Sequence, residues 1–159
     1  MDPDQAAALR TLLATQEVAA LGTLHGAEPF VSMVPYALLP SGRGLVVHVS
    51  RLAQHTKDML ASAAVSLLVV APPSPEVAAQ ALARVTIQAY ARPCAVGDPD
   101  HAEAQRVYLA RFPQSEQMFG FADFSLFVIV PRTARFIGGF AQARSLSAET
   151  LAEILGGPA

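Results

Sequence analysis

The eight residues 50–57, with the sequence SRLAQHTK, bring together several kinds of hydrogen-bond donor, including the only lysine of the chain. They follow an expected strand at 44–49 and open an expected helix that runs to about residue 62. Free backbone N–H groups and the positive end of a helix dipole meet at such a junction, which predicts a site for a phosphate or a carboxylate. The donor side chains are those of Ser50, Arg51, His55, Thr56 and Lys57.

An alternative interpretation applies to each of these donors. Arg51 and Lys57 either clamp an anion or are two solvated charges on a helix surface. His55 could act as an acid–base group or donate a hydrogen bond to a bound ring. The alternative is that it is a polar residue near a helix end with no functional role. The glycine-rich stretch and the Gly-Lys-Ser/Thr sequence of a Walker motif are absent from the chain.

Three further places carry candidate site residues. Ser32 lies in the middle of an expected strand, where its hydroxyl either faces a ligand or is an ordinary outer-face residue. Residues 83–96 alternate between apolar and polar side chains, and this pattern places Thr86 and Gln88 on the wetter face of a long strand. Gly139 and Phe140 stand at an expected strand end, where the backbone approaches either a flat ligand or another strand.

The composition excludes several classes of protein. Hydrophobic residues make up 52% of the chain and charged residues 15%, which argues against disorder and predicts a partner surface, most simply that of a homodimer. The net charge of -2 with dispersed basic residues disfavours nucleic acid as a partner. A single cysteine, Cys94, excludes an internal disulfide, and the histidines lack metal-ligand spacing. The apolar stretch 65–73 is too short for a bilayer, so we expect a cytoplasmic protein without a membrane partner.

The order of patterns predicts an α+β fold in one domain, residues 1–159, with an antiparallel barrel that is closed or partly closed. We expect an antiparallel meander of strands 17–24, 29–38 and 44–49, then strands at 64–70 and 83–96. Two last strands, 123–130 and 134–140, are separated by an expected turn at 131–133. Helices are expected at 4–15, from 98 or 100 to 111, at 113–120, and from a Ser147 cap to the glycines at 156–157.

Six pieces, in this order and spacing, resemble a known family. They are ALGTL (20–24), PFVSMVPY (29–36), SRLAQHTK (50–57), AVSLL (64–68), RVTIQ (84–88) and GGFAQA (138–143). Together they resemble the FMN-binding split-barrel family of pyridoxamine 5′-phosphate oxidase, nearest to the branch of heme-utilisation flavin proteins. The resemblance runs from about residue 18 to residue 143.

The resemblance implies a six-stranded antiparallel split β-barrel with peripheral helices, with a core at about 17–143. It also implies a homodimer with two FMN molecules at the dimer interface. Carried over, Ser50, Arg51, Thr56 and Lys57 would hold the phosphate, with His55 nearby, and Ser32 would face the flavin or its ribityl chain. Thr86 or Gln88 would approach the cofactor, from the same or the other subunit, and Gly139 and Phe140 would line the ring pocket.

The chain departs from the branch at three positions. Asp58 stands where Asn is usual, and a carboxylate beside a phosphate would repel it unless the side chain turns away to pair with Arg51 or Lys57. Ala89 and Ala141 stand where Gly is usual, and each methyl group narrows space for a ligand or backbone. The tryptophan-containing ending of true pyridoxamine phosphate oxidases is absent, so vitamin B6 synthesis is not predicted.

Three hypotheses therefore remain open. The first is an FMN-dependent oxidoreductase that acts on an unidentified small molecule. The second is a non-catalytic flavin- or heme-binding module of the same fold, and the third is a structural dimer without a cofactor.

Overall fold

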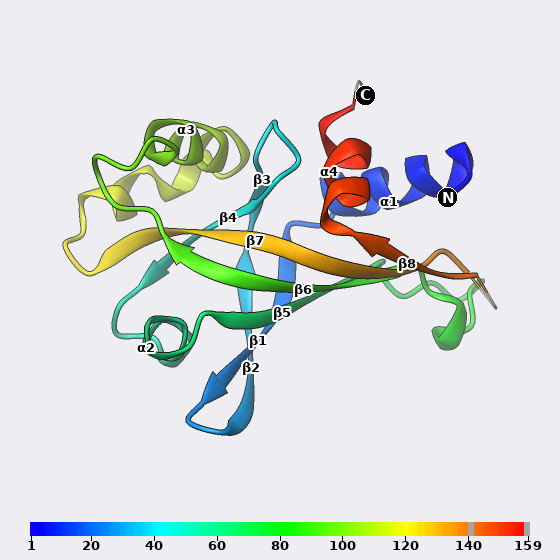
Figure 1. The fold of residues 1–159 in the computed structure, drawn as a ribbon, viewed down its shortest axis with the longest axis horizontal. Helices are drawn as coiled ribbons and strands as arrows, with labels where there is room; N and C mark the ends of the chain where they lie inside the picture. Colours follow the sequence, from blue (N-terminus) through cyan, green and yellow to red (C-terminus); the bar gives the residue numbers. More distant parts are fainter. Residues whose placement is uncertain (140–141, 158–159) are drawn as a thin grey trace.

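The computed structural model describes residues 1–139 and 142–157, and within them eight strands form one curled antiparallel sheet. The strands follow the order β2-β1-β5-β6-β7-β4-β3, and β8 pairs with β7 (Figure 1). Their bounds are β1 Val18–His25, β2 Glu28–Pro35, β3 Ala37–Leu38, β4 Leu45–Ser50, β5 Ala64–Val70, β6 Arg84–Pro93, β7 Phe124–Ile137 and β8 Ala143–Ser147. This arrangement confirms the expected α+β split-barrel class.

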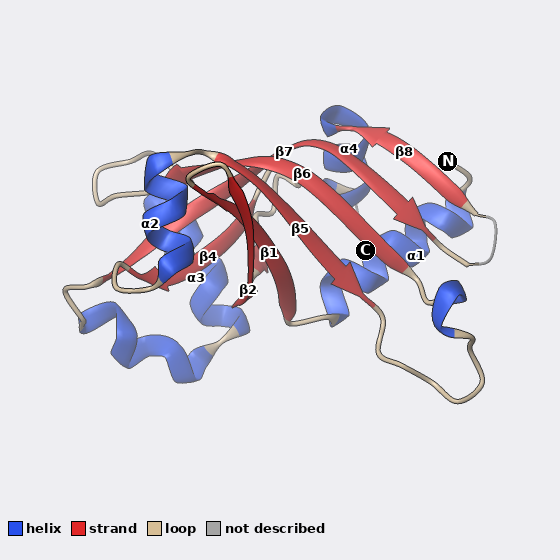
Figure 2. Ribbon diagram, turned by 90° about the horizontal axis from the view of Figure 1, so that it is seen from below, coloured by secondary structure: helices blue, strands red, loops and turns tan. Residues whose placement is uncertain are grey.

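Helices lie at both ends of the sheet (Figure 2). Their bounds are α1 Pro3–Thr15, α2 Gln54–Ala61, α3 His101–Arg111 and α4 Ala148–Gly156, with short 3₁₀ helices η1 Ala79–Ala81 and η2 Pro113–Gly120. Helices α1 and α4 share the main core with the sheet, and the Arg10 Nε of α1 donates to the Ile154 carbonyl oxygen of α4 at 2.8 Å. Among the described residues, no helix is long and apolar enough to cross a membrane.

Alternation along β5 and β6 follows the expected pattern. Val85, Ile87, Ala89 and Ala91 are buried, while Thr86 and Gln88 are exposed on the outer face. The two faces differ because the main core lies on one side of the sheet only. At the β4 end, α3 packs on the outer face over a second apolar cluster, which includes the buried Cys94.

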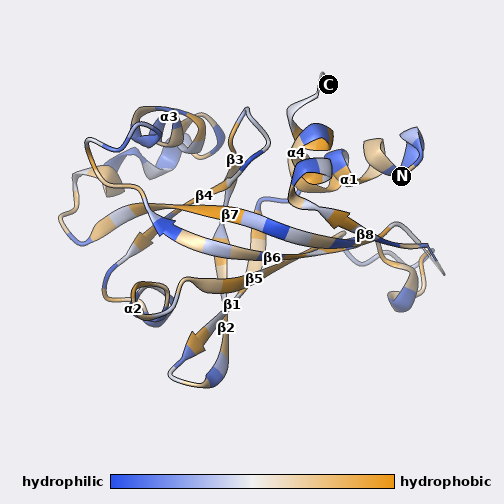
Figure 3. Ribbon diagram, in the orientation of Figure 1, coloured by the Kyte–Doolittle hydropathy of each residue, from blue (hydrophilic) through white to orange (hydrophobic). Residues whose placement is uncertain are grey.

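The expected turn at 131–133 is wrong, because β7 runs unbroken through these residues. Gln88 pairs with Thr133 and Ala89 with Pro131, so Arg132 is the extra residue of a β-bulge. Pro131 is tolerated there because a bulge interrupts the ladder that a proline cannot complete. The first half of β7 pairs with β4 and the second half with β8, and Figure 3 shows the hydropathy changing from apolar to polar along the strand.

The expected meander is correct only in part. Strands β1 and β2 form a hairpin, but β4 pairs with β3 and with β7 rather than with β2. The chain breaks between Pro35 and Ala37, so the expected strand 29–38 becomes two strands. This break and the unexpected β8 explain why there are eight strands rather than the six of the family pattern.

The helix ends were predicted with mixed success. Ser147 caps α4 by accepting from the Thr150 N–H at 3.2 Å, as expected. Helix α1 begins one residue earlier than expected and is capped by Asp2, which accepts from the Gln5 N–H at 2.8 Å. Pro3 at the first helical position explains the earlier start, since its fixed φ suits the first turn of a helix.

We predict that Gly42→Ala destabilises the protein by about 3 kcal/mol, measured as the free energy of unfolding in urea. Gly42 has φ +68°, and an added Cβ would lie 2.7 Å from the Gly156 nitrogen of α4. The matched control is Gly26→Ala, which has φ +63° but no atom within 4 Å of the added Cβ. The control should cost only about 1 kcal/mol of backbone strain. Equal losses in the two variants would contradict the packing of this turn against α4.

Candidate functional site

The anchor segment, residues 50–57, connects the end of β4 to the first turn of α2. Its start is bound to the loop before β7: the Ser50 hydroxyl donates to Asp123 Oδ2 at 2.6 Å, and the Arg51 Nη2 donates to the Ala122 carbonyl oxygen at 2.7 Å. The Ser50 oxygen also accepts from the Leu52 N–H at 3.1 Å. Ser50 is therefore already engaged, whereas the rest of the exposed Arg51 guanidinium is available at the surface.

Helix α2 begins without a side-chain cap, which leaves its first turn open. Its N-cap is Ala53, whose carbonyl oxygen accepts from the N–H groups of Thr56 and Lys57 at 3.2 and 3.3 Å. The N–H groups of Gln54 and His55 donate to no other described residue. Unpaired N–H groups at a helix start favour an anion at this position.

The polar side chains of this turn point in different directions. Lys57 is exposed, whereas Thr56 is fully buried and its Oγ1 has no hydrogen-bond partner among the described residues. His55 is half-buried, and its Nδ1 lies 3.0 Å from the Ser32 Oγ of β2. The structure thus brings Ser32 and His55 together, and burial lowers the pKa of His55, with the nearby Asp58 charge opposing this effect.

Asp58 turns away from the anchor segment, but it does so without pairing with Arg51 or Lys57, the arrangement that the sequence analysis had offered. It is 3% exposed and points to the β1–β2 hairpin, where Thr23 and His25 of β1 are its partners together with Gln54 of its own helix. Burial alone would raise the pKa of Asp58, but hydrogen bonds from His25, Gln54 and Thr23 hold it below its usual value. The acid that faces the anchor segment is Asp123, which the sequence did not single out.

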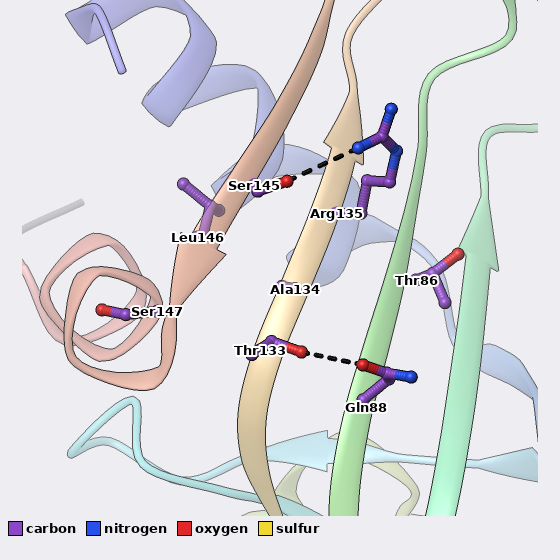
Figure 4. A pocket seen from close by; sticks show the side chains of 8 residues that line it. All are labelled: Thr86, Gln88, Thr133, Ala134, Arg135, Ser145, Leu146 and Ser147. Carbon is purple, nitrogen blue, oxygen red and sulfur yellow. Dashed lines mark hydrogen bonds between the residues drawn. The ribbon is translucent and has the colours of Figure 1, made fainter.

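Thr86 and Gln88 line a different feature, a groove of about 690 Å³ on the outer face of β6, β7 and β8. In this groove the Thr133 Oγ1 donates to the Gln88 Oε1 at 3.1 Å, and the Arg135 Nη1 lies 3.5 Å from the Ser145 Oγ (Figure 4). Among the residues that the structure describes, its lining combines hydroxyls, an amide and one guanidinium, without a carboxylate. These polar side chains can bond a polar or anionic group, while Ala134 and Leu146 add apolar surface to the groove.

Gly139 and Phe140 were expected to line the pocket of the flavin ring. A Cβ added to Gly139 would meet nothing within 4 Å, whereas one added to Gly138 would lie 3.0 Å from the Phe136 ring. Phe140 and Ala141 lie outside the described residues. Ala89 is buried on the core side of β6, so its methyl group does not narrow the groove.

The candidate residues therefore divide into two groups at opposite ends of the sheet (Figure 1). The anchor segment lies near Phe124, which pairs with Ser50, while Gly139 follows Ile137 at the other end of β7. The 14 residues of this strand span about 40 Å at the usual rise per residue. One chain alone cannot place both groups around one flavin-sized molecule.

Comparison with known proteins identifies the family. The model of the family described as pyridoxamine 5′-phosphate oxidase matches residues 6–138. The chain belongs to this family. A heme-binding protein from Mycobacterium smegmatis is similar in structure, with a TM-score of 0.84 and 29% identity over 96% of this chain and 61% of that one.

Two other proteins are similar to this chain. The chloroplastic non-canonical heme oxygenase HOZ of Arabidopsis thaliana is 35% identical over 115 residues, which are 72% of this chain and 33% of that protein. The heme storage protein HutZ of Vibrio cholerae has a TM-score of 0.71 at 20% identity, over 78% of this chain and 87% of that one, and shows the shared fold alone. This member of the pyridoxamine 5′-phosphate oxidase family thus spans one third of the Arabidopsis relative and less than two thirds of the mycobacterial one.

The sequence reasoning missed the cluster around Asp58. Thr23 and His25 are two residues apart on a strand, and Gln54 and Asp58 are four apart on a helix, so each pair shares one face. That spacing was the available signal, but which strand α2 would face was not visible in the sequence.

His48 of β4 is buried against the aromatic rings of the outer-face cluster. It is 8% exposed and stacks on the Phe119 ring at 3.8 Å, and its Nδ1 lacks a partner among the described residues. Burial lowers the pKa of His48 from 6.5 to about 4. The neutral ring is therefore favoured in the folded protein.

We predict that the protein loses stability as the pH falls from 6.5 toward 4. In this range the His48 ring gains a proton in the unfolded chain but stays neutral in the folded protein. The loss from this group is at most about 3 kcal/mol, and it is absent above pH 6.5. Urea unfolding at several pH values measures it. The variant His48→Phe should have a flatter pH profile over this range, whereas the control His101→Asn should retain the wild-type slope. An unchanged slope in His48→Phe would contradict the assignment.

Proposed function

We propose that this protein is a homodimeric FMN-binding flavoprotein that performs a redox reaction on a small molecule. The main support for this proposal is the pair of exposed cations, Arg51 and Lys57, at the uncapped start of α2. Two cations beside the open N–H groups of Gln54 and His55 match the charge and acceptors of a phosphate monoester. Asp58 is turned into the hairpin, so it does not oppose an anion there.

The separation of the candidate residues supports the dimer. The outer face of β2, β1, β5 and β6 is not covered by any described helix, and it carries exposed apolar side chains, with Val31 67% and Met33 61% exposed. Met33, Leu68 and Thr86 share one row across this face through the register of the strands, so the apolar surface continues into the groove. A second copy on this face would cover it and would bring its groove toward the first copy's anchor segment.

In this proposal FMN supplies the electron chemistry when it is bound. Arg51 and Lys57 hold the phosphate, and the Ser32–His55 pair offers a hydroxyl and an imidazole to the ribityl chain or the ring. Thr86 and Gln88, on the groove, contact the cofactor from the other subunit. No side chain needs to act as nucleophile, and the substrate class and the cytoplasmic location stay predictions.

A second candidate is a heme-binding module, with or without catalysis. The names of the mycobacterial, Vibrio and Arabidopsis relatives refer to heme, and at 29% and 35% identity the first and last are related to this chain in sequence. A structural dimer without any cofactor is the third. The colour of the purified protein separates them: a flavin spectrum supports the first, a Soret band the second, and a colourless protein that ignores added FMN and hemin the third.

We predict that the double variant Arg51→Ala/Lys57→Ala binds FMN with a weaker affinity, by roughly 1.5–3 kcal/mol for each lost charged hydrogen bond. Quenching of FMN fluorescence at fixed salt measures the affinity. The control Arg106→Ala removes an exposed cation whose nearest carboxylate, Glu103, is 3.6 Å away on the same helix. Unchanged FMN affinity in the double variant would contradict the anchor, and no binding by the wild type would contradict the flavin proposal.

We also predict that Met33→Asp converts the dimer to a monomer, because a carboxylate on the apolar outer face would be buried without a partner. Light scattering coupled to size-exclusion chromatography measures the mass. The control Val96→Asp changes a side chain that is 88% exposed in the loop after β6, so it should remain dimeric. A monomeric wild type, or a Met33→Asp variant that stays dimeric, would contradict this interface.

A further inference from the structure

The groove on the outer face of β6, β7 and β8 contains two parallel rows of polar side chains. Each row crosses the three strands at residues that pair directly in the sheet. With neighbouring strands about 4.8 Å apart and a rise of about 3.4 Å per residue, the two rows cover roughly 10 by 7 Å. This area and the groove volume of about 690 Å³ suit a small organic molecule. The rows are Thr86, Arg135 and Ser145, and Gln88, Thr133 and Ser147.

The strands around this groove carry positive charge only. Strands β5, β6, β7 and β8 contain five of the 11 basic residues of the chain and no aspartate or glutamate. The chain as a whole has a net charge of -2, so these strands have the opposite sign. Such a surface favours an anion as the ligand. The five cations are Arg84, Arg92, Arg132, Arg135 and Arg144.

Four of these five guanidinium groups are already engaged by the protein itself. Arg92 pairs with two aspartates of the loop after β6, and Arg84 donates to two backbone carbonyl oxygens. Arg132 lies over the Tyr90 ring, with 4.7 Å from its guanidinium carbon to the ring centroid. Arg144 donates to the carbonyl oxygen of the residue before it.

Arg135 differs from the other four because it has almost no partner. Its single hydrogen-bond contact among the described residues joins Nη1 to the Ser145 Oγ at 3.5 Å, which is long for a hydrogen bond. It forms no ion pair with any described carboxylate. The side chain is exposed and rises from the middle strand of the groove (Figure 4). Its N–H donors are therefore open to a ligand there.

The groups in the groove select a carboxylate among the common anions. One guanidinium supplies one positive charge, and its planar fork matches the two oxygens of a carboxylate. A phosphate monoester carries about two negative charges and needs more donors, whereas the backbone N–H groups of β7 face its neighbouring strands. The Ser145 hydroxyl beside Arg135 can donate to the same carboxylate. Ala134 and Leu146 offer apolar surface to the rest of the ligand.

We propose that this groove binds a small organic carboxylate, and that Arg135 is the residue that binds the carboxylate group. The site itself stands on the groove of one chain. Its assignment to the substrate rests on the proposed function, in which the groove of one subunit is brought toward the anchor segment of the other. The substrate of the flavoprotein is then an organic acid with an apolar part.

The test is a titration of the purified protein with para-fluorobenzoate, followed by the width of its fluorine NMR line. The amide para-fluorobenzamide has the same shape without the charge, and para-fluorophenyl phosphate carries the other anion. We expect the benzoate to bind more tightly than both. In Arg135→Gln its affinity should fall at least about tenfold, because a charged hydrogen bond is lost. The matched control Arg144→Gln, on the adjacent strand, should bind the benzoate as the wild type does.

Arg135→Lys gives a second test that keeps the charge. It lacks the planar fork, so it should bind the benzoate more weakly than the wild type. Circular dichroism and the Tm show whether each variant is folded. If Arg135→Gln does not fold, Arg135→Lys decides the assignment.

FMN binding, measured separately, distinguishes this site from the flavin proposal. Arg135→Gln should bind FMN as the wild type does, because Arg135 is not part of the anchor segment. A protein that binds the benzoate through Arg135 but binds no FMN would support the carboxylate site and contradict the flavin proposal. The inference is overturned if the benzoate does not bind, if the amide or the phosphate binds as tightly, if folded Arg135 variants keep the wild-type affinity for the benzoate, or if Arg135→Gln loses FMN.

Discussion

The buried carboxylate of Asp58 determines how α2 sits on the sheet. It accepts from two side chains of β1 and one of its own helix, so this side of α2 must face the hairpin. Successive helical residues are turned by about 100°. Once Asp58 faces the hairpin, Lys57 is exposed and His55 meets Ser32, as observed. The geometry of the anchor segment thus follows from the hydrogen bonds of Asp58, the residue that comes directly after it.

The long strand β7 sets a second constraint. Its bulge at Arg132 lets one strand pair with β4 along its first half and with β8 along its second half. The sheet can therefore curl, with separate helix layers at its two ends. This also places the anchor segment and the outer-face groove far apart, with an exposed apolar surface that continues into the groove. In the proposed dimer, a second copy covers that surface and brings the two groups together.

Much of this fold could be predicted from local pattern. Alternation in β6, the Ser147 cap and the anchor segment between β4 and α2 all depend on neighbours a few residues away, and all three were found. The pairing partner of β4 is β7, which lies more than seventy residues away along the chain. The short loops suggested instead that β4 pairs with the preceding strand β2, and this was wrong. The sequence of residues 131–133 fits a turn and a β-bulge equally well. Only the pairing with β6 distinguishes the two structures.

In the candidate site, too, local features could be predicted from the sequence and long-range contacts could not. The residue types of the anchor segment were visible, but the directions of their side chains were not. Adjacency to Lys57 made Asp58 look like a competitor for a phosphate, although the true neighbour of the segment is Asp123, far along the chain. The burial of Thr56 depends on the packing of α2 against the sheet, which no local pattern records.

The chemistry of position 58 explains why a carboxylate suits this chain. The three groups that face it, a hydroxyl, a protonated ring nitrogen and an amide nitrogen, are all available as donors. An asparagine would offer one accepting oxygen and would direct its own N–H₂ toward at least one of these donors. An aspartate accepts from all of them, and burial strengthens these bonds because competing water is excluded. The aspartate is therefore matched to Thr23, His25 and Gln54, and the hairpin, not the anion site, explains why it suits this chain better than the asparagine that the resemblance led us to expect.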